Sequence, residues 1–293
     1  MGILPHCNHE CYSYDMELKY FSRNGIILPI KDAVIPLSNI EYAYGFGVYE
    51  TVRVLGTIPY FIDDHIARLI ESAKAIDLSH TFTAPFIKRS ILDLVRKMPP
   101  KAQNVKLLLI GGPTKEKASL FILCINPLFP DKKLYKDGAT MITYRYERDF
   151  PHAKTLNMLQ SYLAYKKARG AGAYDALLIN RAGNITEGTR TNFFCIKKKT
   201  IYTPPEKNIL PGIMRKAMLR IAKANHYAIV ESNIALRDVP SYDGAFITST
   251  VSKIMPVKSI DVRILKPRPE ALAKLMVTFD DFLTKCGGAM YTD

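Results

Sequence analysis

Strand-like and helix-like segments follow one another along the whole of this 293-residue chain, and that mixture limits the folds open to it. β-Branched and aromatic residues run through Tyr49–Phe61, and Gly56 in the middle of this run predicts a hairpin. Apolar residues then recur at helical spacing over residues 63–78. A strand over residues 139–148 is followed by a helix that ends near Arg169. The sequence therefore predicts a mixed α/β (α+β) class.

A short segment rich in Lys and Asp, residues 131–137, interrupts this pattern and predicts a linker. It separates a smaller N-terminal α/β domain, residues 1–130, from a larger domain, residues 138–293. With 48% hydrophobic residues, the chain has enough apolar material for two cores.

The net charge of +14 raises the question of nucleic acid. The basic residues are spread out, with only short runs such as 132–133 and 197–199, and no basic motif interleaved with aromatic residues accompanies them. A solvated basic surface is the better interpretation, and no nucleic-acid partner is expected.

No apolar run approaches the roughly 20 residues that a membrane-spanning helix needs. The N-terminus has no secretory pattern, and five irregularly spaced cysteines do not form a disulfide framework. We therefore expect a cytoplasmic protein without a membrane partner. His6, Cys7, His9 and Cys11 lie close together, but no second ligand pair follows at zinc spacing, so no metal site is expected.

Five short stretches hold residues suited to a cofactor site. They are HIARL (His65–Leu69), AKTLN (Ala153–Asn157), ITEGTRTNFF (Ile185–Phe194), LPGIMR (Leu210–Arg215) and TSTVS (Thr248–Ser252). In this order they resemble the fold-type IV pyridoxal-phosphate enzymes, the class IV aminotransferase family. That family includes branched-chain and D-amino acid aminotransferases and aminodeoxychorismate lyases. The resemblance spans residues 40–260 and implies two domains, the larger with a β-barrel-like core, in a homodimer or higher homo-oligomer.

The resemblance implies a role for each motif. Lys154 would hold the aldehyde of pyridoxal 5'-phosphate as a Schiff base and then move the substrate proton. Glu187 would keep the pyridine nitrogen protonated, which makes the cofactor an electron sink. Arg68 would meet the phosphate, together with Thr250 and the backbone N–H groups of Ile213 and Met214 at a helix start. Taken alone, each of these residues would more often be an ordinary exposed or structural residue than part of a cofactor site.

Substrate recognition is less specified by the sequence. Tyr44 and Tyr49 match family positions on the substrate side, and Arg53 and Arg190 are candidates for the substrate carboxylate. D-amino acid enzymes are known for an Arg and a His in the loop that here reads GGPTKEKASL, which contains neither. Met158 stands where many branched-chain enzymes have a tyrosine, and Met214 where the family often has threonine.

These features predict an aminotransferase that works by a ping-pong mechanism, with an aliphatic or branched-chain L-amino acid and a 2-oxo acid such as 2-oxoglutarate as substrates. The alternatives are a D-amino acid aminotransferase with a different carboxylate-binding group, an aminodeoxychorismate lyase, and a binding protein that kept the fold without the activity.

Overall fold

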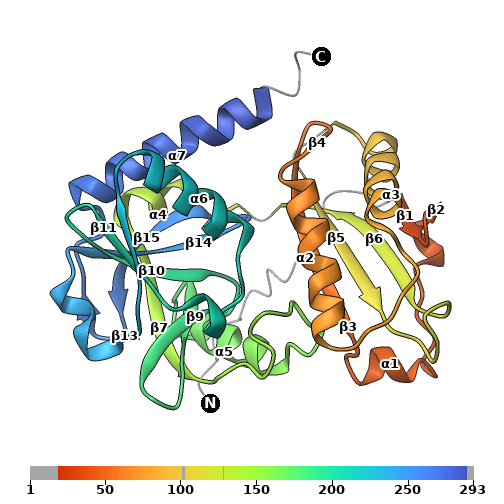
Figure 1. The fold of residues 1–293 in the computed structure, drawn as a ribbon, viewed down its shortest axis with the longest axis horizontal. Coiled ribbons are helices and arrows are strands. Elements are labelled where there is room, and N and C mark those ends of the chain that lie inside the picture. Colours follow the sequence, from red (N-terminus) through yellow and green to blue (C-terminus); the bar gives the residue numbers. More distant parts are fainter. Residues whose placement is uncertain (1–18, 101–102, 128, 289–293) are drawn as a thin grey trace, which may run out of the picture.

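The computed structural model describes residues 19–100, 103–127 and 129–288, and it shows two β-sheets with helices packed on both (Figure 1). The first sheet is antiparallel throughout, in the order β2-β1-β6-β5-β3-β4. Its strands are β1 (Tyr20–Arg23), β2 (Ile26–Pro29), β3 (Gly47–Leu55), β4 (Ile58–Pro59), β5 (Gln103–Ile110) and β6 (Ser119–Ile125). The expected hairpin is present as β3 and β4.

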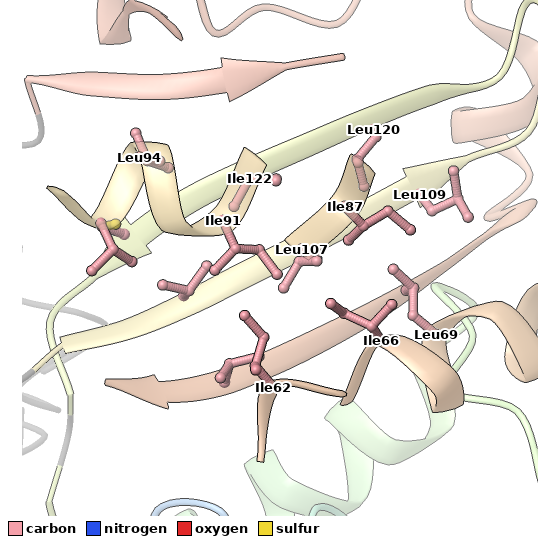
Figure 2. Close-up of a cluster of buried hydrophobic side chains, with 14 of the residues drawn as sticks. Ile62, Ile66, Leu69, Ile87, Ile91, Leu94, Leu107, Leu109, Leu120 and Ile122 are labelled. Atoms are coloured by element: carbon pink, nitrogen blue, oxygen red, sulfur yellow. The ribbon is translucent and has the colours of Figure 1, made fainter. Parts of the chain in front are cut away.

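Two amphipathic helices, α2 (Ile62–Ala75) and α3 (Ala84–Lys97), cover one face of this sheet. Figure 2 shows Ile66 and Leu69 of α2 and Ile91 of α3 pointing toward Leu107 of β5. Alternate residues of β3 are buried, as expected for a strand with one face on a core. In Figure 1, α2 lies on the side of the sheet that faces the rest of the molecule. Two short helices, η1 (Ile30–Asp32) and α1 (Ile40–Ala43), precede β3.

The second sheet contains a closed six-stranded barrel. The ring runs β10-β14-β15-β7-β8-β9 and returns to β10 through the pair Asn192–Glu187. Its strands are β7 (Ala139–Arg145), β8 (Asp175–Ile179), β9 (Asn184–Gly188), β10 (Asn192–Lys197), β14 (Gly244–Ser249) and β15 (Lys253–Ile260). Shorter strands extend the sheet beyond the ring: β11 (Thr200–Thr203), β12 (Ala228–Glu231), β13 (Ile234–Ala235) and β16 (Arg263–Ile264). The expected mixed class and barrel-like core are thus confirmed.

Helices cover the barrel from outside. Helices α6 (Ile213–Ala224) and α7 (Glu270–Gly288) share an apolar core with β10, β11 and β14, and α5 (Leu159–Gly170) packs its alanines against β8. Two 3-10 helices, η2 (Glu206–Asn208) and η3 (Leu236–Ser241), lie in connecting segments. Among the described residues, no helix is both long and apolar enough to cross a membrane.

The segment expected to be a linker forms α4 (Lys132–Asp137), which Asp131 caps by accepting a hydrogen bond from the Lys133 N–H. All strands of the first sheet come before this helix and all strands of the second come after it. The domain limits 1–130, 131–137 and 138–293 stay a prediction.

Candidate active site

A pocket lies where β9 and β10 close the barrel. Two of its lining residues, Tyr49 on β3 and Arg68 on α2, come from the first sheet and its helix cover. The remainder come from the barrel side. The full lining is Tyr49, Arg68, Arg148, Lys154, Glu187, Thr189, Arg190, Thr191, Asn192, Leu210, Gly212, Ile213, Met214, Thr248, Ser249 and Thr250. The pocket therefore joins residues far apart in the chain.

Lys154 is held through its backbone by the first sheet and its helix. Its carbonyl accepts a hydrogen bond from the Tyr49 N–H at 2.8 Å, and its N–H donates to the Ser72 Oγ of α2 at 3.1 Å. The next residue, Thr155, makes an antiparallel bridge to Val48. The lysine side chain is left to enter the pocket, where its Nζ lies 4.2 Å from the centre of the Tyr49 ring.

Gly47 permits this backbone pairing. A Cβ at position 47 would lie 2.7 Å from Leu156 Cδ1 and 2.8 Å from the Leu109 carbonyl oxygen. The Leu156 N–H donates to the Gly47 carbonyl at 2.8 Å. The lysine segment and β3 approach each other this closely because position 47 has no side chain.

Tyr49 has an unusual ionisation environment because of the lysine. Burial alone would raise the pKa of its phenol, but the charge of Lys154 and a hydrogen bond with it outweigh burial, so the pKa is lowered. The ionisation of the Tyr49 hydroxyl is thereby coupled to Lys154, the amine predicted to hold the cofactor.

Glu187 lies on β9 at the barrel closure and is almost fully buried. Its Oε1 accepts from Arg148 Nη1 at 3.1 Å, and its Oε2 accepts from the Leu210 N–H at 3.2 Å. Burial raises the pKa of this carboxyl, and the Arg148 charge opposes the rise only in part.

Arg148 was not predicted from the sequence. It follows β7 among other charged residues, with Arg145 and Glu147 close by, and nothing in that stretch distinguishes it. Its position six residues before Lys154 was the one available signal.

Another part of the pocket is formed by Arg68 and by the N-terminus of α6, which together supply a cation and several N–H groups. Helix α6 begins at Ile213 after Gly212, which provides no side-chain cap, so the N–H groups of its first turn lack intrahelical acceptors. Arg68 reaches this point and donates from Nη1 to the Pro211 carbonyl at 3.0 Å. Ile213, Met214 and Thr250 all line the same pocket.

Gly212 is also required by close packing. A Cβ there would collide with the Asn192 Oδ1. Asn192 in turn donates from Nδ2 to the Leu210 carbonyl at 2.8 Å, which fixes the turn before α6. The buried Thr248 Oγ1 lines the pocket and has no partner among the described residues.

The predicted substrate residues divide into two groups. Tyr49 and Arg190 line the pocket, with the Arg190 guanidinium 4.0 Å from the centre of the Tyr165 ring. Tyr44 is 82% exposed at the end of α1, and Arg53 lies against the Phe129 ring; neither lines the pocket. The His6–Cys11 cluster lies outside the described residues, within which no group of side chains suited to a metal ion occurs.

Comparison with known proteins identifies the class. The family model of amino-transferase class IV matches residues 47–260, and the chain belongs to that family.

Among individual relatives, a protein of Methanocaldococcus jannaschii named as a candidate branched-chain-amino-acid aminotransferase is 32% identical, over 92% of this chain and 98% of its own. The D-alanine aminotransferase of Bacillus licheniformis is also 32% identical, over 81% of this chain and 87% of its own. The structure of the branched-chain aminotransferase of Thermoproteus uzoniensis with norvaline superposes with a TM-score of 0.82 at 26% identity, covering 91% of this chain and 95% of that one.

Class IV aminotransferases use pyridoxal 5'-phosphate, and the protein is a pyridoxal-phosphate-dependent transaminase. The pocket residues fit this cofactor. An amine, a buried carboxylate and an arginine beside a helix N-terminus are the groups that an aldehyde, a pyridine nitrogen and a phosphate require. The buried Thr248 hydroxyl, which has no partner among the described residues, adds one more hydrogen-bonding group beside the pocket.

Proposed function

We propose that the protein transfers an amino group from an aliphatic or branched-chain L-amino acid to a 2-oxo acid such as 2-oxoglutarate by a ping-pong mechanism. The observation that carries the substrate class is the loop between β5 and β6. Its basic side chains are Lys115 and Lys117, and it has no arginine or histidine to bind a substrate carboxylate in the D-specific manner. In the structure, Lys115 is exposed and pairs with Glu116 at 3.9 Å.

Bound pyridoxal phosphate would supply an aldehyde that condenses with amines and a ring that accepts an electron pair. Lys154 Nζ is the group that would hold the aldehyde at rest and then carry the proton that the substrate Cα loses. Its backbone anchors to Tyr49 and Ser72 restrict the amine to one region of the pocket.

Glu187 would accept a hydrogen bond from the pyridine nitrogen, and Arg148 keeps that carboxylate oriented. Arg68, Thr250 and the N–H groups of Ile213 and Met214 would bind the phosphate. Tyr49 would face the substrate next to Lys154.

A second candidate is a D-amino acid aminotransferase. It is favoured by the 32% identity with the Bacillus licheniformis D-alanine enzyme, which equals that of the archaeal relative. In that case Arg190, at the exposed side of the pocket, is our candidate for the substrate carboxylate.

A single spectroscopic experiment separates the two candidates. The protein loaded with pyridoxal phosphate is mixed with L-leucine or with D-alanine, without any oxo acid, and the absorption of the cofactor is followed. We expect L-leucine to bleach the band and 2-oxoglutarate to restore it, which is the behaviour of two separate half-reactions. Bleaching by D-alanine alone would overturn the assignment to L-amino acids. Release of pyruvate from aminodeoxychorismate without an amino acceptor would identify a lyase instead.

A further inference from the structure

Glu50, on β3, is a fully buried carboxylate that the sequence analysis did not single out. Both of its oxygens accept hydrogen bonds from one side of the Arg68 guanidinium, Oε1 from Nε at 2.6 Å and Oε2 from Nη2 at 2.9 Å. This is a bidentate ion pair, the geometry in which an arginine is held most firmly.

The carboxylate is itself fixed by two further donors. The buried His65 donates from Nδ1 to Oε2 at 2.8 Å, and the Thr51 N–H donates to Oε2 at 3.2 Å. Burial would raise the pKa of Glu50, but the charge of Arg68 and the hydrogen bonds from His65 and Arg68 outweigh it and hold the pKa well below its usual range. Glu50 is therefore a charged carboxylate with a fixed orientation.

His65 is the neutral member of this group. Burial lowers the pKa of its imidazole, and the Glu50 carboxylate only partly offsets that effect. The ring therefore donates one N–H to Glu50 without adding a charge, so Arg68 is the cation that balances the carboxylate.

Arg68 connects this group to the pocket. While Nε and Nη2 donate to Glu50, Nη1 donates to the carbonyl of Pro211. Pro211 lies just before Gly212, the residue that precedes α6. Arg68 and the first residues of α6 line the same pocket. The direction in which the remaining guanidinium N–H groups point is set by Glu50 on one side and by Pro211 on the other.

We infer that Glu50 is a positioning residue for phosphate recognition: it orients Arg68 toward the phosphate of the cofactor without touching the cofactor. The inference rests on the proposed role of Arg68 and deepens it. An arginine with free rotation would also attract a phosphate, but it would lose side-chain entropy on binding and would leave its N–H groups less well aligned.

The test compares two molecules that differ only in the phosphate. Dissociation constants of pyridoxal phosphate and of pyridoxal are measured by absorption on the cofactor-free full-length chain, for the parent and for Glu50→Gln. Glutamine keeps the shape of the side chain and removes its charge. We expect Glu50→Gln to weaken binding of pyridoxal phosphate at least about tenfold and to leave binding of pyridoxal unchanged.

A matched control is Glu206→Gln, which removes the charge from a carboxylate that pairs with the buried Arg215 at 2.7 Å outside the pocket. It should leave the ratio of the two constants unchanged. If Glu50→Gln does not fold, Glu50→Asp serves in its place, since it keeps the buried charge and withdraws it from Arg68. The expected result is again a selective loss of affinity for the phosphate form.

Equal weakening of both ligands would show a general structural role and overturn the inference, and so would unchanged binding of both. Arg68→Met tests the underlying assignment separately. If that variant still prefers pyridoxal phosphate as strongly as the parent, the phosphate role of Arg68 fails and the inference fails with it. If Arg68→Met loses the preference and Glu50→Gln keeps it, only the inference about Glu50 is overturned.

Discussion

At the scale of single residues, the pair of Arg148 and Glu187 shows how strongly a buried charge depends on one neighbour. Both side chains are largely buried, and the carboxylate has one ion-pair partner among the described residues. Removal of one member of a buried pair leaves the other uncompensated, which is more costly than removal of both.

We expect Arg148→Met to lower the free energy of unfolding by about 3 kcal/mol, because Glu187 would be left buried without its cation. The double variant Arg148→Met with Glu187→Gln should recover most of that loss but not the transaminase activity. Denaturant unfolding of the two variants measures the difference. Arg96→Met, which breaks an exposed pair with Asp93, is the control and should change stability by less than about 1 kcal/mol. An equal loss in the single and double variants would contradict the argument.

The sequence predicted the pocket residues that carry a recognisable motif and missed those defined by their partners. Lys154, Glu187 and Arg68 lie together in the pocket, as the motifs suggested. Arg148 lies in the pocket and Glu50 lies behind Arg68, and each is defined by a partner far along the chain, 39 and 18 residues away. Such contacts depend on the fold, so no local pattern marks them.

At the scale of elements, the lysine segment acts as a short extra strand on the edge of β3. It pairs with the first residues of β3, and β4 pairs only with Val54 and Leu55 at the other end. The pairing uses backbone groups, and its close approach depends on Gly47.

We predict that Gly47→Ala destabilises the protein by about 1 to 3 kcal/mol and lowers kcat, because the added methyl would push Leu156, and with it Lys154, away from β3. Thermal unfolding and steady-state kinetics provide the measurement. Gly170→Ala at the end of α5 is the matched control, since an added Cβ there meets nothing within 4 Å. A Gly47→Ala variant with parental stability and kcat would show that the segment is not constrained at this point.

The strands predicted over residues 49–61 and 139–148 and the helices that follow them are present, but two other helices were not predicted. Helix α3 was not predicted, although Thr83 caps it and Pro85 lies in its first turn, which are both start signals. Helix α7 was also missed. The closure of the barrel, by contrast, rests on the pair of Asn192 and Glu187 and has no signature in the sequence.

At the scale of the whole molecule, large apolar side chains are exposed in the segment before β3. Val34, Leu37, Ile40 and Tyr44 are all more than half exposed. A group of this kind on one segment is typical of an association surface. It supports the homodimer that the family resemblance implies.

We expect the protein to have twice the 33.1 kDa mass of one chain in light scattering after size-exclusion chromatography. The double variant Leu37→Glu with Ile40→Glu should shift the mass toward that of a single chain, because charges would be buried in the interface. Val262→Glu changes an equally exposed side chain in the turn between β15 and β16 and is the control. A dimer that both variants leave intact would place the interface elsewhere.

The pairing of residues 154–156 with β3 has a consequence for recombination among relatives of this protein. By chain order Lys154 belongs to the second half, but its backbone hydrogen bonds are made to the first sheet and to helix α2. A hybrid that joined residues 19–125 of one relative to residues 139–288 of another would keep the lysine and inherit a foreign strand edge to hold it. The residues at positions 47 and 156 of the two parents would have to be compatible, because the side chain of Leu156 occupies the space that Gly47 leaves open. The two halves of this molecule therefore cannot be exchanged between relatives independently of each other.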